Sequence, residues 1–121
     1  MHELSVALAL VECAEDKARE LGVARVHAVH VRIGPLAGVL SDPLLFAFDL
    51  AARDTLVDGA RLVIEPEPVV AWCARCVAER PLTDIRRRRC PACDEPTPEL
   101  VSGDALELLA LEVADDVPAH S

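Results

Sequence analysis

Residues 73–93 read CARCVAERPLTDIRRRRCPAC and hold four of the five cysteines of this 121-residue chain as two Cys-x-x-Cys pairs, Cys73/Cys76 and Cys90/Cys93. Zn²⁺ prefers four tetrahedral ligands, and a tight turn brings thiolates at positions i and i+3 to the same side of the chain. The segment around the pairs has few apolar side chains, and about 30 such residues need a metal because they cannot bury enough surface to fold alone. We therefore predict a zinc site that uses all four cysteines.

This predicted site is closed. Four thiolates leave no coordination position for water or substrate, so the zinc is expected to be structural, and a zinc-dependent hydrolase is disfavoured. A redox role for either pair is the alternative, but neither pair follows a strand and opens a helix as thioredoxin-like motifs do. The fifth cysteine, Cys13, is predicted to be a small packed hydrophobe on the first helix.

The composition of the cysteine-rich segment differs from that of the rest of the chain. Residues 66–98 hold six of the nine prolines, and residues 71–96 carry six arginines against four acidic residues, whereas the remainder has six basic and seventeen acidic residues. Such a shift indicates a domain boundary. We predict an acidic body of residues 1–66 plus 100–114, an inserted basic zinc module at residues 67–99, and a frayed tail at residues 115–121.

Hydrophobic periodicity predicts the elements of the body. Residues 4–21 repeat apolar side chains at three- and four-residue steps, which is typical of an amphipathic helix. Residues 25–33 alternate as a strand does, with Val29, Val31 and Ile33 on one face. Ser41 is expected to cap a second helix that runs to about Thr55, and residues 60–65 and 105–113 are expected to be strands. The predicted apolar stripe of the first helix consists of Leu4, Leu8, Val11, Ala14, Ala18 and Leu21.

The overall charge limits the partners that the chain can have. Twelve basic and 21 acidic residues give a net charge of −9, whereas binding to phosphate groups needs a basic surface. No segment has the roughly 18 apolar residues of a membrane-spanning helix, and the N-terminus lacks the features of a signal peptide. We therefore expect a cytoplasmic protein that binds neither nucleic acid nor membrane.

The run Arg86–Arg89 leaves one alternative open. A zinc-ribbon module could use these four arginines to bind nucleic acid or a transcription protein. A run of arginines without interleaved aromatic residues is more often a solvated or partner-binding face, and the net negative charge of the chain also disfavours nucleic acid.

The chain begins Met1-His2-Glu3, which places several nitrogen donors on consecutive bonds. The donors are the Met1 α-amine, the deprotonated backbone amide of His2 and the His2 imidazole, and the backbone amide of Glu3 can supply a fourth. Fused chelate rings of this kind favour a planar arrangement, which suits Ni²⁺ or Cu²⁺ better than Zn²⁺. The chemistry alone leaves open whether the terminus is a site. His27 and His30 are interpreted as surface or hydrogen-bonded residues.

Several motifs occur together and in a characteristic order along almost the whole chain. They are MHELS at residues 1–5, VRIG at 31–34, LFAFD at 45–49, GARL at 59–62, the two Cys-x-x-Cys pairs, and residues 103–112. Together they resemble the HypA/HybF family of nickel metallochaperones for hydrogenase maturation. The combination is far more specific than any single motif.

The resemblance implies an α+β fold, in which two helices pack on a small three-stranded sheet to form a nickel-binding domain with an inserted four-cysteine, zinc-ribbon-like module. It implies that Ni(II) binds at Met1, His2 and Glu3 as transient cargo, and that structural Zn(II) binds at Cys73, Cys76, Cys90 and Cys93. The zinc module contains no histidine, so no further nickel ligand is assigned.

The same resemblance implies a carrier and not an enzyme. Members of this family work with a hydrogenase maturation GTPase and deliver nickel to the large-subunit precursor of [NiFe]-hydrogenase, and some also serve urease. The expected state is a monomer or a homodimer.

Overall fold

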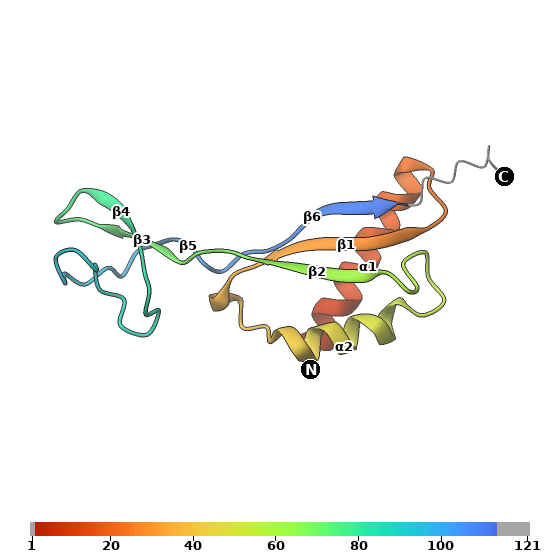
Figure 1. Cartoon of the computed structure of the whole chain (residues 1–121), viewed down its shortest axis with the longest axis horizontal. Coiled ribbons are helices and arrows are strands. Elements are labelled where there is room, and N and C mark those ends of the chain that lie inside the picture. Colours follow the sequence, from red (N-terminus) through yellow and green to blue (C-terminus); the bar gives the residue numbers. More distant parts are fainter. Residues whose placement is uncertain (1, 114–121) are drawn as a thin grey trace. The chain divides into compact units, whose positions relative to one another are not determined.

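The computed structural model describes residues 2–113, with side chains from Glu3 onward (Figure 1). Met1, the side chain of His2 and the predicted tail at 115–121 lie outside the described residues. The elements, in chain order, are α1 (His2–Leu21), β1 (Val26–Ile33), the 3₁₀ helix η1 (Pro35–Ala37), α2 (Ser41–Ala52), β2 (Arg61–Pro66), β3 (Val70–Cys73), β4 (Ala78–Pro81), β5 (Leu100–Ser102) and β6 (Leu106–Val113). Two helices with two small three-stranded sheets confirm the predicted α+β class.

The described residues form two compact units. The first comprises residues 2–31, 39–65 and 107–113, and the second comprises residues 32–38 and 66–106. No helix within residues 2–113 is both long and apolar enough to cross a membrane.

β1 is the central strand of the first sheet, between β2 and β6. The Val26 N–H donates to the Leu56 carbonyl oxygen at 3.1 Å, so β1 and β2 start near each other and run parallel, with α2 as the crossover. At the other end of β1, the Gly34 N–H donates to the Ala105 carbonyl oxygen at 2.9 Å, which makes β6 antiparallel to β1. Val29, Val31 and Ile33 are buried as predicted.

The helices pack against each other, but the predicted apolar stripe of α1 was partly wrong. Leu4, Leu8 and Leu21 are 40, 52 and 60% exposed, and Cys13 is exposed instead of packed. Every position from residue 6 to residue 11 is apolar, so periodicity alone does not choose one face. The residues of α1 that are buried are Val6, Ala7, Leu10, Val11, Ala14 and Ala18.

The predicted cap of α2 was also wrong. Ser41 is the first residue of the helix, and the residue in the N-cap position is Leu40, whose side chain makes no capping hydrogen bond. The helix ends at Ala52 because Arg53 adopts a non-helical conformation, with φ −57° and ψ 134°. The buried face of α2 consists of Leu44, Ala47, Phe48 and Ala52.

The second sheet has β3 at its centre, paired antiparallel with β4 and with β5. Its register places Cys73 opposite Ala78 at the end of the β3–β4 hairpin. The core of this unit is small, since its buried cluster consists of Val69, Ala71 and Leu82. Such a core needs additional stabilisation from a cross-link or a metal.

Candidate metal centres

The four predicted zinc ligands come together in the second unit. Cys73 ends β3 and Cys76 lies in the following turn, whereas Cys90 and Cys93 lie in the loop between β4 and β5. The four Sγ atoms lie within 4.8 Å of one another. The Sγ atoms of Cys73 and Cys93 are 3.6 Å apart, and those of Cys76 and Cys90 are 3.9 Å apart. A tetrahedral zinc with Zn–S bonds of about 2.3 Å requires sulfurs about 3.8 Å apart, so the cluster fits one zinc ion.

In both cysteine pairs, the sulfur of the first cysteine accepts a hydrogen bond from a backbone N–H two or three residues later. The Cys76 N–H donates to Cys73 Sγ, and the Ala92 N–H donates to Cys90 Sγ, both at 3.4 Å. Each pair is followed by a residue with positive φ, at 51° for Val77 and 63° for Asp94. The chain therefore turns away sharply after presenting each pair of sulfurs. A β-branched residue such as Val77 rarely adopts this conformation, which indicates that the surrounding structure imposes it.

Two thiols of the cluster differ in how readily they form the thiolate, which is the form that binds zinc. Burial raises the pKa of the Cys90 thiol, but hydrogen bonds from the backbone N–H groups of Cys93 and Ala92 and from the Cys93 and Cys73 side chains together lower that pKa to about 6. The Glu95 N–H lowers the pKa of Cys93, but burial and the neighbouring thiols raise it to about 12. Four sulfurs this close cannot all ionise unless a cation balances them, which is consistent with a metal site.

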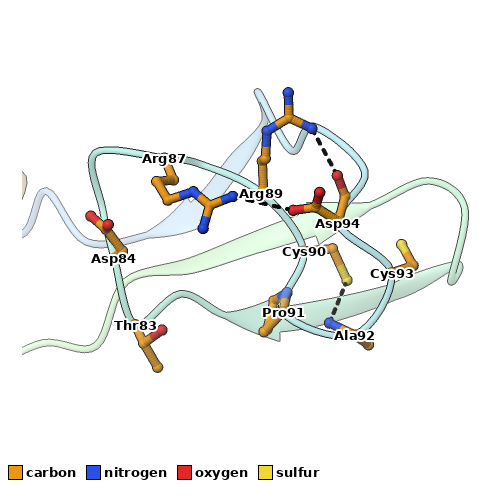
Figure 2. A pocket seen from close by; sticks show the side chains of 9 residues that line it. All are labelled: Thr83, Asp84, Arg87, Arg89, Cys90, Pro91, Ala92, Cys93 and Asp94. Carbon is orange, nitrogen blue, oxygen red and sulfur yellow. Dashed lines mark hydrogen bonds and ion pairs between the residues drawn. The ribbon is translucent and has the colours of Figure 1, made fainter.

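A hollow of about 410 Å³ lies beside the second cysteine pair (Figure 2). Arginines of the run Arg86–Arg89 project around it and contact acidic or carbonyl groups of the same module. Arg87 Nη2 is 3.5 Å from Asp94 Oδ1, and Arg89 Nη1 donates to the Asp94 carbonyl oxygen at 2.9 Å. These contacts favour a structural and solvated role for the run over nucleic-acid binding.

Of the three predicted nickel ligands at the N-terminus, Glu3 is the one that the structure describes together with its side chain. α1 begins at His2, and the carboxylate of Glu3 is partly exposed. Glu3 Oε2 accepts a hydrogen bond from the Leu40 N–H at 3.1 Å, which joins the first turn of α1 to the start of α2. Sequence analysis missed this contact because the two residues are 37 positions apart and no local pattern links them.

The Glu3 contact predicts a measurable contribution to stability. We expect Glu3→Ala, studied without nickel, to lower the free energy of unfolding by about 1 kcal/mol, because the Leu40 N–H loses a carboxylate acceptor. Urea denaturation followed by circular dichroism measures the change. Glu12→Ala, at an exposed position of the same helix, is the control and should change stability by less than about 0.5 kcal/mol. Equal stability of the two variants would contradict the structural role of Glu3.

The two histidines of β1 have the environments that the sequence analysis favoured. His30 Nε2 lies 2.6 Å from Glu112 Oε2, and this hydrogen bond lowers the pKa of Glu112. His27 is exposed. Within residues 3–113, the four cysteines are the only group of His, Cys, Asp and Glu side chains close enough together to hold a metal.

Comparison with known families agrees with this arrangement. The family model described as "Hydrogenase/urease nickel incorporation, metallochaperone, hypA" matches residues 1–113. The chain belongs to the HypA family. The predicted resemblance is thereby confirmed, and the chain is a nickel metallochaperone of hydrogenase maturation. Nickel is its cargo, and the four-cysteine cluster fits the predicted structural zinc.

Curated HypA proteins align with this chain over nearly its full length. The chain is 49% identical over 118 residues to the hydrogenase maturation factor HypA of Roseiflexus sp. (strain RS-1), an alignment that covers 98% of this chain and 96% of the relative. It is 54% identical over 112 residues to HypA of Chloroflexus aurantiacus (strain J-10-fl), covering 93% of this chain and 98% of that relative.

Solved structures of HypA proteins have the same fold. The solution structure of the Ni metallochaperone HypA from Helicobacter pylori matches with a TM-score of 0.67 and 25% identity, covering 92% of this chain and 96% of that one. A second solution structure of a HypA protein matches with a TM-score of 0.70 and 26% identity, covering 94% and 97%.

Proposed function

We propose that this HypA chain holds Ni(II) at its N-terminus through Met1, His2 and Glu3 and delivers it to the large-subunit precursor of [NiFe]-hydrogenase, together with a maturation GTPase. The observation that carries the proposal is the family match, which starts at residue 1 and so includes the Met-His-Glu terminus. The cytoplasm is the proposed compartment, as composition predicts.

The backbone geometry of α1 supports the proposed donor set. His2 is the first residue of the helix, and the N–H groups of the first four residues of a helix have no acceptor within it. Deprotonation of the His2 amide for nickel binding therefore breaks no hydrogen bond of the helical ladder. The proposed planar set of nitrogen donors can form at the N-terminal start of α1 while the hydrogen bonds of the helix stay intact.

Glu3 has a different part in this proposal. Its backbone amide can complete the planar set, whereas its carboxylate accepts the hydrogen bond from Leu40. The side chain thus orients the first turn of α1, from which the other donors extend. A site at a chain terminus also suits transfer, because few contacts must break when a partner takes the ion.

We further propose that the protein acts as a carrier and not as an enzyme, with zinc held by Cys73, Cys76, Cys90 and Cys93. Four sulfur ligands complete the coordination of zinc, so the role of this metal is to stabilise the module at residues 67–99. The zinc site supplies no activated water, and nickel leaves the protein chemically unchanged.

The nickel site is tested by moving the terminal amine. We expect the protein with its native terminus to bind one Ni(II) in isothermal titration calorimetry. An extension of two residues before Met1 and the variant His2→Ala should each lose this tight binding, because each removes a donor from the fused chelate rings.

The matched control is His27→Ala, which removes an exposed histidine elsewhere in the first unit and should bind nickel like the wild type. Unchanged nickel affinity of the extended protein would show that the terminal amine is not a ligand.

A further inference from the structure

Arg80 of β4 lies on the same side of the second sheet as Cys73. The register pairs Arg80 with Ala71 and Ala78 with Cys73. Paired residues of antiparallel strands project to the same face, and residues two apart along one strand also share a face. The Arg80 side chain therefore extends from the sheet toward the four-cysteine cluster, and the sequence analysis assigned it no role.

Two of the cysteine side chains stabilise the positive charge of Arg80. Hydrogen bonding to the side chain of Cys76 is the strongest influence that raises the pKa of Arg80, and Cys90 acts in the same direction, while burial opposes them. Cys76 and Cys90 come from different pairs, and their sulfurs are 3.9 Å apart. One side chain of β4 thus reaches both halves of the cluster.

Arg80 Nε is buried and has no hydrogen-bond partner among the described residues. A buried N–H without an acceptor is costly, so its presence needs a compensating interaction. Among residues 3–113, Arg80 forms no ion pair with a carboxylate, whereas Arg75, Arg86 and Arg87 pair with Glu95, Asp84 and Asp94. Among the same residues, Arg88 and Arg89 also form no ion pair with a carboxylate, but both are exposed, so Arg80 is the partly buried arginine of the module that lacks a carboxylate partner.

Four thiolates and one Zn²⁺ carry a net charge of −2, which is unfavourable in a partly buried site. A neighbouring guanidinium reduces this charge and donates charge-assisted hydrogen bonds to the thiolates. The exposed run Arg86–Arg89 lies in water, where its charges are screened.

We propose that Arg80 is the cation that balances the zinc–tetrathiolate centre, with its guanidinium directed to Cys76 and Cys90, and that it slows the loss of zinc. The inference rests on the proposed four-cysteine site. Arg80 is a positioning residue, because it acts on the metal only through the sulfur ligands. This role also explains why a charged side chain occupies a partly buried position of β4, in a unit whose apolar core is so small.

The test measures how fast zinc leaves the full-length, zinc-loaded protein at one fixed pH. Arg80→Met keeps an unbranched, flexible side chain but removes the guanidinium with its charge and donors, so a chromophoric chelator should remove zinc about tenfold faster than from the wild type. Arg80→Lys retains the charge and should have an intermediate rate. Arg86→Met is the matched control, because the Arg86 side chain is 90% exposed, and it should release zinc at the wild-type rate.

The outcomes separate this inference from the site on which it rests. If the wild-type protein binds no zinc, the four-cysteine site itself is refuted. Zinc-containing wild type, together with equal release rates for Arg80→Met and Arg86→Met, would overturn the role of Arg80 and leave the site intact. If Arg80→Met does not fold, Arg80→Gln and Arg86→Gln take the places of the two methionine variants, and equal rates again overturn the inference.

Discussion

Cys73→Ala is expected to reduce the zinc content of the protein from one ion to none. Cys73 is fully buried at the end of β3, and its sulfur accepts the Cys76 N–H and lies 3.6 Å from the sulfur of Cys93. Alanine leaves three thiolates and an open position, so the tetrahedral set is lost. Metal analysis of the purified protein measures this result.

The loss of zinc should unfold the module and leave the helical unit folded. Structural zinc contributes about 10–16 kcal/mol in small zinc-finger peptides, and the apolar core around Val69 and Ala71 is too small to replace it. Hydrogen exchange should therefore become faster throughout residues 66–98, while α1 and α2 keep their protection. Cys13→Ala is the control, since Cys13 is exposed and lies outside the cluster. Full zinc occupancy of Cys73→Ala would refute the four-cysteine assignment.

The zinc cluster was predictable because its signal is local. Two residues between the cysteines of each pair suffice to form a turn, and the metal then dictates how the two pairs approach each other. Strand β1 was predictable for a similar reason, because Val29, Val31 and Ile33 alternate with polar residues. In both segments, residues within a few positions of one another carry the information.

The contacts that the sequence did not reveal depend on the folded arrangement. Glu3 and Leu40 meet only because α1 and α2 pack together, and Arg80 reaches the cysteines only through the register of β3 and β4. The face of α1 was misjudged because alanines and leucines alternate so densely that several faces are apolar. Helix packing selects the face with the small residues, such as Ala7 and Ala14, since they allow close approach.

Gly34 marks a close approach of two backbone segments within the second unit. A Cβ atom at this position would overlap the carbonyl group of Gly103 and lie 2.8 Å from the Asp104 nitrogen. Two hydrogen bonds hold the segments together, from the Gly34 N–H to Ala105 at 2.9 Å and from the Leu36 N–H to Gly103 at 2.8 Å. The backbone at Gly34 therefore cannot move away without losing these bonds.

The opposite segment is fixed as firmly. Glu67 Oε1 accepts the N–H groups of Gly103 and Ala105 at 2.9 and 3.0 Å. On its other side, Gly103 is packed so closely against Val69 that a Cβ on Gly103 would lie 3.0 Å from a Val69 methyl group. Movement of Gly103 away from a new methyl group at residue 34 would thus disturb the core of the unit.

Gly34→Ala is therefore expected to lower the free energy of unfolding of the zinc-loaded protein by about 3 kcal/mol or more, from steric overlap and the loss of one or two backbone hydrogen bonds. The control is Gly38→Ala. Gly38 has a positive φ of 77° but open space around the added methyl group, so its substitution should cost only about 1–2 kcal/mol from backbone strain. Urea unfolding of both variants separates the two effects, because backbone conformation strains Gly38→Ala and steric overlap destabilises Gly34→Ala. Equal destabilisation would show that the two segments can move apart at little cost, which the hydrogen bonds of Glu67 and Gly34 argue against.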